Sequence, residues 1–327
     1  MKINNKYFSA AVLKVSGLLL AGMLVPSAAH ACACGCSVFD VGTGSMFPDL
    51  NGVHTNAASP IFGPGMVSLQ YVYSDQNHNW SGTSSAPAAN NDDKEIRTHF
   101  VTLGWQQMFN RSWGIQAQIP YDFRYFKTKD GAGNIISRSW HQLGDIRVEG
   151  VYTGFKQDGS AGLTLGVKLP SGSHTVYSDV ADRDTQIGTG STDLLLGSFY
   201  HGHLTKDRKW GWFAQARLDL PLMTQEQYRP GLEVDAAAGI DYHGWSLGRV
   251  KISPVAQMIM SERARDGGAN SDTPNTGYQR ILLAPGIEFN VKPVKFYVDA
   301  ELPVFQNYSG NQLAAPFLLK MSVSLSY

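Results

Sequence analysis

Three cysteines near the amino terminus are the residues whose type and spacing best suit metal or redox chemistry. Cys32, Cys34 and Cys36 stand at alternate positions, and on an extended chain alternate side chains point the same way. Three thiolates could therefore converge on a soft metal ion such as Cu(I) or Zn(II), although zinc sites usually have the spacing C-x2-C. Two alternatives stay open: a disulfide with one thiol left over in an oxidising compartment, or lipidation of Cys32. No other cofactor is expected.

Charged residues form a second candidate set, because they recur at alternate positions between apolar ones. Asp145, Arg147 and Glu149 would share one face of a strand and could form a ladder of ion pairs. Inside a barrel such charges either line an aqueous path or join the wall through ion pairs, and the sequence leaves both interpretations open. The candidate lumen-lining residues are Asp122, Arg124, Asp145, Arg147, Glu149, Lys168, Arg217, Asp219, Glu233, Asp235, Arg249, Lys251, Lys295, Asp299 and Glu301.

Two classes of protein are not indicated. The pair nearest to a hydrolase site is His141 with Asp145, and no serine can be placed beside it, so we expect no enzymatic activity. Lys2, Lys6 and Lys14 precede residue 32 and no acid does, which leaves 24 bases and 27 acids in the rest of the chain. That balance gives no basic patch, and we expect no nucleic-acid partner.

The elements that must position the charged residues are β-strands of alternating polarity. In residues 111–127, apolar and aromatic side chains occupy every second position and polar ones fall between them. Strands of about ten residues match a tilted crossing of a bilayer. We therefore predict an all-β fold, a single antiparallel outer-membrane β-barrel. Its twelve strands are expected near 66–76, 95–109, 111–127, 141–155, 161–170, 191–202, 210–222, 232–243, 249–262, 278–290, 294–303 and 316–327.

The connections between these strands alternate in length. Short ones are expected near Asn110 and at 156–160, 203–209, 244–248 and 291–293. Longer ones are expected at 77–94, 128–140, 171–190, 223–231, 263–277 and 304–315. Short periplasmic turns and longer extracellular loops are typical of outer-membrane barrels, and an even strand number places both termini in the periplasm.

The amino-terminal part is expected to precede the barrel. Residues 1–31 have a basic start, an apolar segment too short to span a bilayer and a small-x-small site at 29–31, which together predict a signal peptide. Residues 32–65 hold all three cysteines and several glycines and prolines. We interpret them as an irregular periplasmic or plug segment, which leaves 66–327 for the barrel.

The last eleven residues, 317–327, form a strand with one apolar and one polar face. Lys320 and three serines are expected to face the lumen, and the apolar face would contact outer-membrane lipid. This strand should pair with 294–303 and with 66–76 and so close the ring. Its final Tyr327 resembles the carboxy-terminal signal that the barrel-assembly machinery recognises.

Four motifs in order resemble an outer-membrane transporter family named for the MetA pathway of phenol degradation. They are Ile119-Pro120-Tyr121, Gly144-Asp145, Lys168-Leu169-Pro170-Ser171-Gly172 and Gly188-Thr189-Gly190-Ser191-Thr192-Asp193. The resemblance implies a barrel for passive passage of small, often aromatic or hydrophobic, solutes, and it implies no fixed binding residues. The alternative hypothesis is a structural barrel that anchors a periplasmic metal or redox partner through the cysteine segment.

Overall fold

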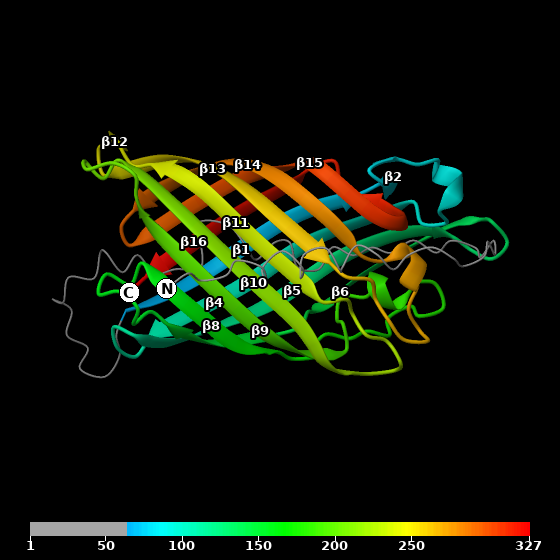
Figure 1. Cartoon of the computed structure of the whole chain (residues 1–327). Coiled ribbons are helices and arrows are strands. Elements are labelled where there is room, and N and C mark those ends of the chain that lie inside the picture. Colours follow the sequence, from blue (N-terminus) through cyan, green and yellow to red (C-terminus); the bar gives the residue numbers. More distant parts are fainter. Residues whose placement is uncertain (1–63) are drawn as a thin grey trace, which may run out of the picture.

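The computed structural model describes residues 64–327, and these residues form one closed antiparallel β-barrel (Figure 1). Residues 1–63, which contain the expected signal peptide and almost all of the segment 32–65, lie outside the described range. Thirteen strands occupy twelve positions in the wall, because β6 and β7 both pair with β5. The wall strands are β1 (Gly65–Gln76), β4 (Glu95–Met108), β5 (Trp113–Lys129), β6 (Ile135–Leu143), β7 (Arg147–Tyr152), β8 (Ala161–Lys168), β9 (Ser191–His203), β10 (Trp210–Thr224), β11 (Glu233–Tyr242), β13 (Val250–Arg263), β14 (Tyr278–Val291), β15 (Val294–Ala314) and β16 (Leu318–Ser326).

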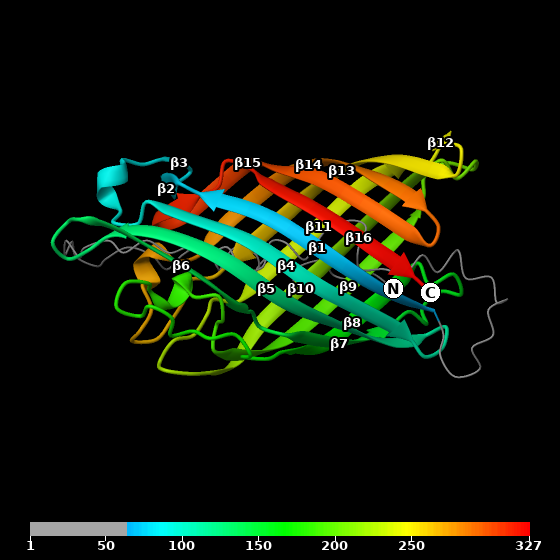
Figure 2. The ribbon, with the colours of Figure 1, turned by 180° about the vertical axis from the view of Figure 1, so that it is seen from behind.

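The first and last strands close the ring, as the alternating carboxy-terminal segment predicts. Met66 pairs with Ser326 and Ser74 with Leu318, while the other edge of β16 pairs with β15 (Figure 2). The Tyr327 amide also donates to the Gly65 carbonyl at 2.9 Å. Because every wall position has two neighbours, no edge strand runs the full height of the barrel, as a bilayer requires.

The barrel wall is apolar outside and mainly polar inside. On β1, Val67 and Leu69 are exposed outward, whereas Ser68 and Ser74 are buried on the inner face. On β16, Lys320 is buried and Met321 is exposed. This pattern is the reverse of a soluble barrel and fits a wall that faces lipid. No helix among the described residues is long and apolar enough to cross a membrane.

Aromatic side chains gather at one end of the barrel, which we call the turn end. Trp113 stacks against Tyr152, Tyr200 against Trp212, and Trp210 against Tyr242, with ring centroids 4.6–5.0 Å apart. Five short connections lie there: 109–112, 153–160, 204–209, 243–249 with β12 (Trp245–Leu247), and 292–293. A ring of amphipathic aromatics is typical of the level where hydrocarbon meets headgroups.

The opposite end, the loop end, carries the connections 77–94, 130–134, 169–190, 225–232, 264–277 and 315–317. The first contains β2 (His78–Gly82), β3 (Ser84–Ser85) and the 3-10 turn η3 (Ala88–Asn90); 169–190 contains η4 (Arg183–Thr185) and 264–277 contains η5 (Thr273–Asn275). Four of these six connections match the expected long loops.

Two expected loops are wrong. Residues 128–140 form a tight hairpin instead, because β5 and β6 stay paired up to a turn in which the Asp130 carboxylate accepts from the Ala132 and Asn134 amides at 2.9 and 2.8 Å. Residues 304–314 continue β15, because this segment pairs with β14 and then with β2 above the barrel. The alternation of polar and apolar residues does not show where a strand extends beyond the bilayer.

The expected strand 141–155 is interrupted at Gly144–Ile146 and becomes β6 and β7. The Gly144 amide donates to the Pro120 carbonyl at 2.9 Å, and a Cβ at Gly144 would stand 2.8 Å from the Pro120 ring. Beyond this bend β6 pairs with β5 alone, and β8 ends at Lys168. The connection 169–190 takes the place of the missing strand pairing.

Candidate functional site

The inside of the barrel contains a chamber that is partly open to solvent. Its lining comes from nine wall strands, β1, β4, β5, β7, β8, β9, β10, β11 and β13, from the bend 144–146, and from the loops 169–190 and 225–232. Eight lining side chains are charged: Asp122, Asp145, Arg147, Lys168, Asp193, Asp219, Glu233 and Arg263. Of these, Asp122, Asp145, Arg147, Lys168, Asp219 and Glu233 are predicted lumen-lining residues. The alternation of the strands thus brings them to one space.

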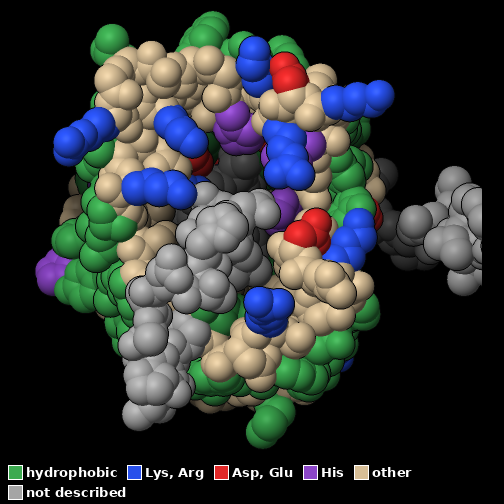
Figure 3. Space-filling model, turned by 90° about the vertical axis from the view of Figure 1, so that its left-hand side faces the viewer, with side chains coloured by type: hydrophobic (Ala, Val, Ile, Leu, Met, Phe, Trp, Pro, Cys, Tyr) green, Lys and Arg blue, Asp and Glu red, His purple; other side chains and the backbone are tan. Residues whose placement is uncertain are grey.

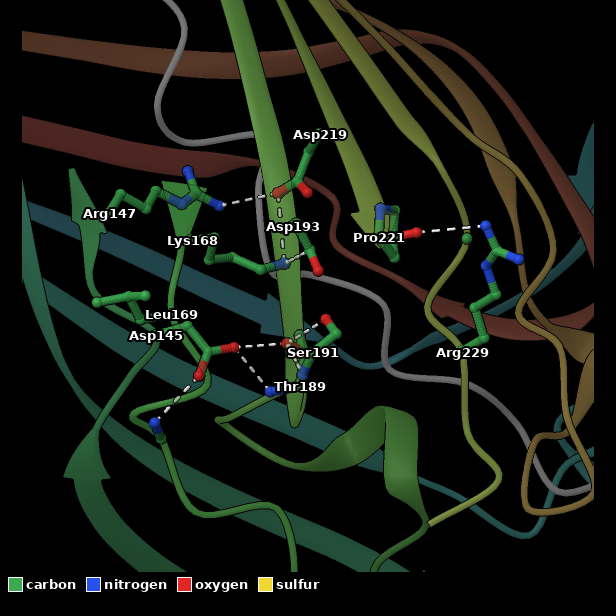
Figure 4. Close-up of polar contacts among 12 residues, drawn as sticks. Asp145, Arg147, Lys168, Leu169, Thr189, Ser191, Asp193, Asp219, Pro221 and Arg229 are labelled. Atoms are coloured by element: carbon green, nitrogen blue, oxygen red, sulfur yellow. Dashed lines mark hydrogen bonds and ion pairs between the residues drawn. The ribbon is translucent and has the colours of Figure 1, made fainter. Parts of the chain in front are cut away.

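Lys168, at the end of β8, lies between two carboxylates (Figure 4). It forms an ion pair with Asp193 on β9, and its Nζ lies 3.3 Å from Asp219 Oδ2 on β10. Arg147 Nη2 lies 3.7 Å from the same Asp219 oxygen. Buried charges are costly unless paired, so two cations and two carboxylates stabilise one another on this wall.

Glu149 on β7 is the centre of a second group. Its carboxylate accepts hydrogen bonds from Gln116 Nε2 at 2.6 Å, Thr164 Oγ1 at 3.0 Å and Arg217 Nη2 at 3.0 Å. The donors stand on β5, β8 and β10. Asp145, Arg147 and Glu149 therefore take partners on other elements rather than forming the expected ladder along one strand.

Two of the predicted lining residues hold the loop 169–190 against the inner wall. The Asp145 carboxylate accepts from the Gly172 amide at 3.0 Å and from the amide and hydroxyl of Thr189 at 2.8 and 2.6 Å (Figure 4). Arg124 on β5 donates through Nη1 to the Gln186 carbonyl at 3.1 Å. The loop consequently folds into the barrel mouth and contributes Ile187 and Thr189 to the chamber.

Apolar side chains also line the chamber. Ile187 belongs to a buried cluster with Phe126, Trp140 and Leu313. Phe100, another lining residue, belongs to a second cluster that includes Val72, Ile259 and Leu318. The chamber lining is therefore mixed, with apolar side chains beside charged ones: Phe100 pairs in register with Asp122.

The remaining predicted residues fall into two places. Asp299 accepts from Tyr297 and Gln257 at 2.8 and 2.9 Å, Lys320 Nζ lies 2.7 Å from Glu301, and Asp235 is buried on β11. Arg249, in contrast, is exposed in the turn before β13, Lys251 is exposed at the start of that strand, and Lys295 is half-buried at the start of β15. These three lie at the turn end of the barrel rather than in the chamber.

Three charged residues of the inner face were not among the predicted ones. Asp193 stands in the motif 188–193 and alternates in step with the buried Ser191 and Leu195, so the period of two could have found it. Arg263 and Arg280 also lie on buried strand positions; Arg263 pairs with Asp266 at 2.8 Å and Arg280 lies 4.0 Å from the Tyr278 ring centroid. Both arginines lie near a strand end, where too few alternating residues flank them to show the period of two.

Carboxyl groups in the loops are also buried. Burial raises the pKa of Asp93 to about 8. Burial, with Asp182 and Asp266 nearby, raises the pKa of Asp184 well above its usual value. No group of three or more His, Cys, Asp or Glu within 64–327 has the arrangement of a metal site. The cysteines at 32, 34 and 36 lie outside the described residues, so the soft-metal expectation stays untested.

Solved structures resemble the fold. An outer membrane channel from Pseudomonas putida F1 matches with a TM-score of 0.60 at 12% identity, over 83% of this chain and 97% of that one. The chain has the fold of an outer-membrane β-barrel. The β domain of the Bordetella autotransporter BrkA (TM-score 0.47, 11% identity, 81% and 99% covered) and the NanC porin (0.42, 11%, 79% and 98%) match less well and carry no argument.

Sequence comparison adds nothing to this barrel assignment. No family model matches the chain, and no curated protein matches it either. The resemblance of four motifs to the MetA-pathway transporters therefore stays a prediction, while the fold is confirmed by the structure.

Proposed function

We propose that this barrel lies in a bacterial outer membrane and lets small solutes pass by diffusion through the inner chamber. The main observation behind this proposal is that side chains from nine wall strands line one chamber, which is partly open to solvent. Most of its charged side chains are in ion pairs or accept hydrogen bonds, so they can face a passing solute without drawing a counter-ion into a fixed site. The similar fold of an outer membrane channel supports this function.

The proposed solutes are small amphipathic molecules, including aromatic compounds that carry a polar group. Phe100 and Ile187 offer apolar contacts, and Lys168, Asp193 and Asp219 offer hydrogen bonds in the same lining. A purely ionic solute would have to pass the apolar clusters without compensation. A solute with both kinds of surface fits this mixed lining.

The proposed orientation has the turn end and both termini in the periplasm and the longer loops outside. The short turns, the extended hairpin β5–β6 and the projection of β15 support it. β16, with its apolar face and final Tyr327, would be read by the barrel-assembly machinery.

Conductance of the purified full chain in planar bilayers tests the channel. Thr102→Trp places a bulky ring in the chamber lining, whereas Val101→Trp, one residue away, places the same ring on the outer face. We expect the first variant to lower single-channel conductance by half or more and the second to leave it unchanged. Equal conductance of wild type and Thr102→Trp would refute the chamber as the path.

The alternative function, anchoring a periplasmic metal or redox partner, depends on Cys32, Cys34 and Cys36. No contact among the described residues favours it. Cys34→Ser with permeation measured in parallel separates the two functions, because only the anchoring function predicts a loss with normal conductance.

A further inference from the structure

Charge is segregated between the two ends of the barrel. The five turn-end connections contain seven bases and two acids, whereas the six loop-end connections contain four bases and nine acids. Residues 64–327 together are almost neutral, so the excess at each end is a property of the ends and not of the composition. The seven bases are Arg111, Lys156, Lys206, Arg208, Lys209, Arg249 and Lys292, and we call them the turn-end rim.

The bases of the turn-end rim surround the whole mouth. Figure 3 shows Lys and Arg side chains on all sides of this end, with few Asp and Glu between them. Each of the five turns supplies at least one base, and all seven are exposed. Of these seven bases, only Lys209 forms an ion pair with another described residue, Asp207, at 3.7 Å. The rim therefore presents positive charge that the described chain leaves uncompensated.

The rim lies immediately beyond the aromatic ring of the turn end. Lys156 Nζ stands 4.2 Å from the Tyr200 ring centroid and donates to its hydroxyl. Arg111 precedes Trp113 by two residues, and Lys209 directly precedes Trp210. Because such aromatics mark the boundary between hydrocarbon and headgroups, the bases stand at the level of lipid phosphates.

We propose that the turn-end rim binds the headgroups of anionic phospholipids in the leaflet around this end of the barrel. A ring of bases at headgroup level fits a lipid leaflet that surrounds the barrel. A binding surface for a single acidic protein would instead be expected as a basic patch on one side of the mouth. Attraction between basic residues and anionic lipids acts over about a Debye length and is screened by salt. The proposal rests on the membrane location proposed above and not on conduction.

The tryptophans offer a probe of this leaflet. Trp105, Trp113, Trp210 and Trp245 are exposed at the turn end, whereas Trp140 is buried and Trp80 is partly buried near the loop end. Quenching by brominated lipids therefore reports mainly on lipid bound at the turn end. The full chain is placed in vesicles that contain brominated phosphatidylglycerol or brominated phosphatidylethanolamine at equal mole fraction.

We expect stronger quenching by phosphatidylglycerol at low salt and loss of this preference at about 1 M salt. The variant Lys206→Gln/Arg208→Gln/Lys209→Gln should weaken the relative binding constant by about fivefold or more, since each base near an anionic surface accounts for a change of that order. The matched control, Lys127→Gln/Lys129→Gln/Arg265→Gln, removes three bases near the loop end and should keep the preference.

Three results would overturn the proposal. Equal quenching by the two lipids in the wild type would exclude anionic lipid and leave an acidic protein as the occupant of the rim. Equal loss in the rim variant and the control would show a net-charge effect. A preference that survives in the rim variant, with circular dichroism showing an intact barrel, would place the anionic lipid elsewhere. Quenching by neither lipid would instead show that the barrel does not enter the bilayer, which is the failure of the proposed location.

Discussion

The Asp145 carboxylate is expected to decide whether the loop 169–190 stays inside the barrel. It accepts three hydrogen bonds, from the Gly172 amide and from the amide and hydroxyl of Thr189, at 2.6–3.0 Å. Hydrogen bonds to a charged group contribute about 1.5–3 kcal/mol each. Because Arg124 and the packing of Ile187 still hold the loop in Asp145→Ala, we expect the free energy of local opening to fall by about 3 kcal/mol rather than by the full sum.

Amide hydrogen exchange of the full chain measures this change. A loss of about 3 kcal/mol corresponds to roughly a hundredfold faster exchange when the amides exchange by local opening. The effect should be confined to 169–190 and the bend at Gly144–Ile146, and single-channel conductance should become noisier or larger, because Ile187 and Thr189 leave the chamber lining.

A matched control separates anchoring from general destabilisation. In Asp130→Ala a carboxylate that accepts from two amides is also removed, but it lies in the exposed turn between β5 and β6. That variant should leave exchange in 169–190 unchanged. If the loop in Asp145→Ala exchanges as slowly as in the wild type, the three hydrogen bonds do not hold it and the reasoning fails.

Three further predictions concern buried charge, backbone contact and pH. Lys320→Met leaves the fully buried Glu301 carboxylate without its cation and should lower the free energy of unfolding in urea by about 3–5 kcal/mol; Lys320→Met/Glu301→Gln should recover much of this, and a single variant as stable as the wild type would contradict it. Gly188→Val should disorder the loop mouth, since a Cβ at this position would stand 2.2 Å from the Gly172 carbonyl oxygen; unchanged thermal stability and exchange would show that the two segments can part at little cost. The pKa of Asp93, raised by burial to about 8, favours the neutral carboxyl in the folded loop, so this contribution to stability is lost progressively as the pH rises from about 4 and is gone once the pH has passed 8. Exchange of the connection before β4, corrected for the intrinsic rate, should be about a hundredfold faster at pH 9 than at pH 6, and Asp93→Asn should abolish the difference.

Hydrophobic alternation alone was enough to predict the wall of the barrel. The period of two assigns each side chain of a strand to one face, so Asp122, Glu149 and Asp219 could be placed inside without a structure. The same period led to the pairing of β16 with β1 and β15. The ends of the strands were less predictable. In β15 the alternation of polar and apolar residues continues beyond the bilayer. On both sides of the bend at residues 144–146 the alternation also continues, so the sequence pattern does not reveal the bend.

The sequence by itself therefore determined the fold class, the strand number and the two faces of the wall, because these follow from local side-chain direction. Only the tertiary structure decided what the inner charges do. Arg124 and Asp145 bind backbone atoms of a loop that is distant along the chain, and Arg147 and Glu149 take partners from β10. Such contacts depend on the distances between strands around the closed barrel, and these distances cannot be inferred from a local sequence pattern. The charged residues of the two ends were likewise present in the sequence. Their segregation could be recognised only from the closed barrel, which places the five short turns together at one mouth.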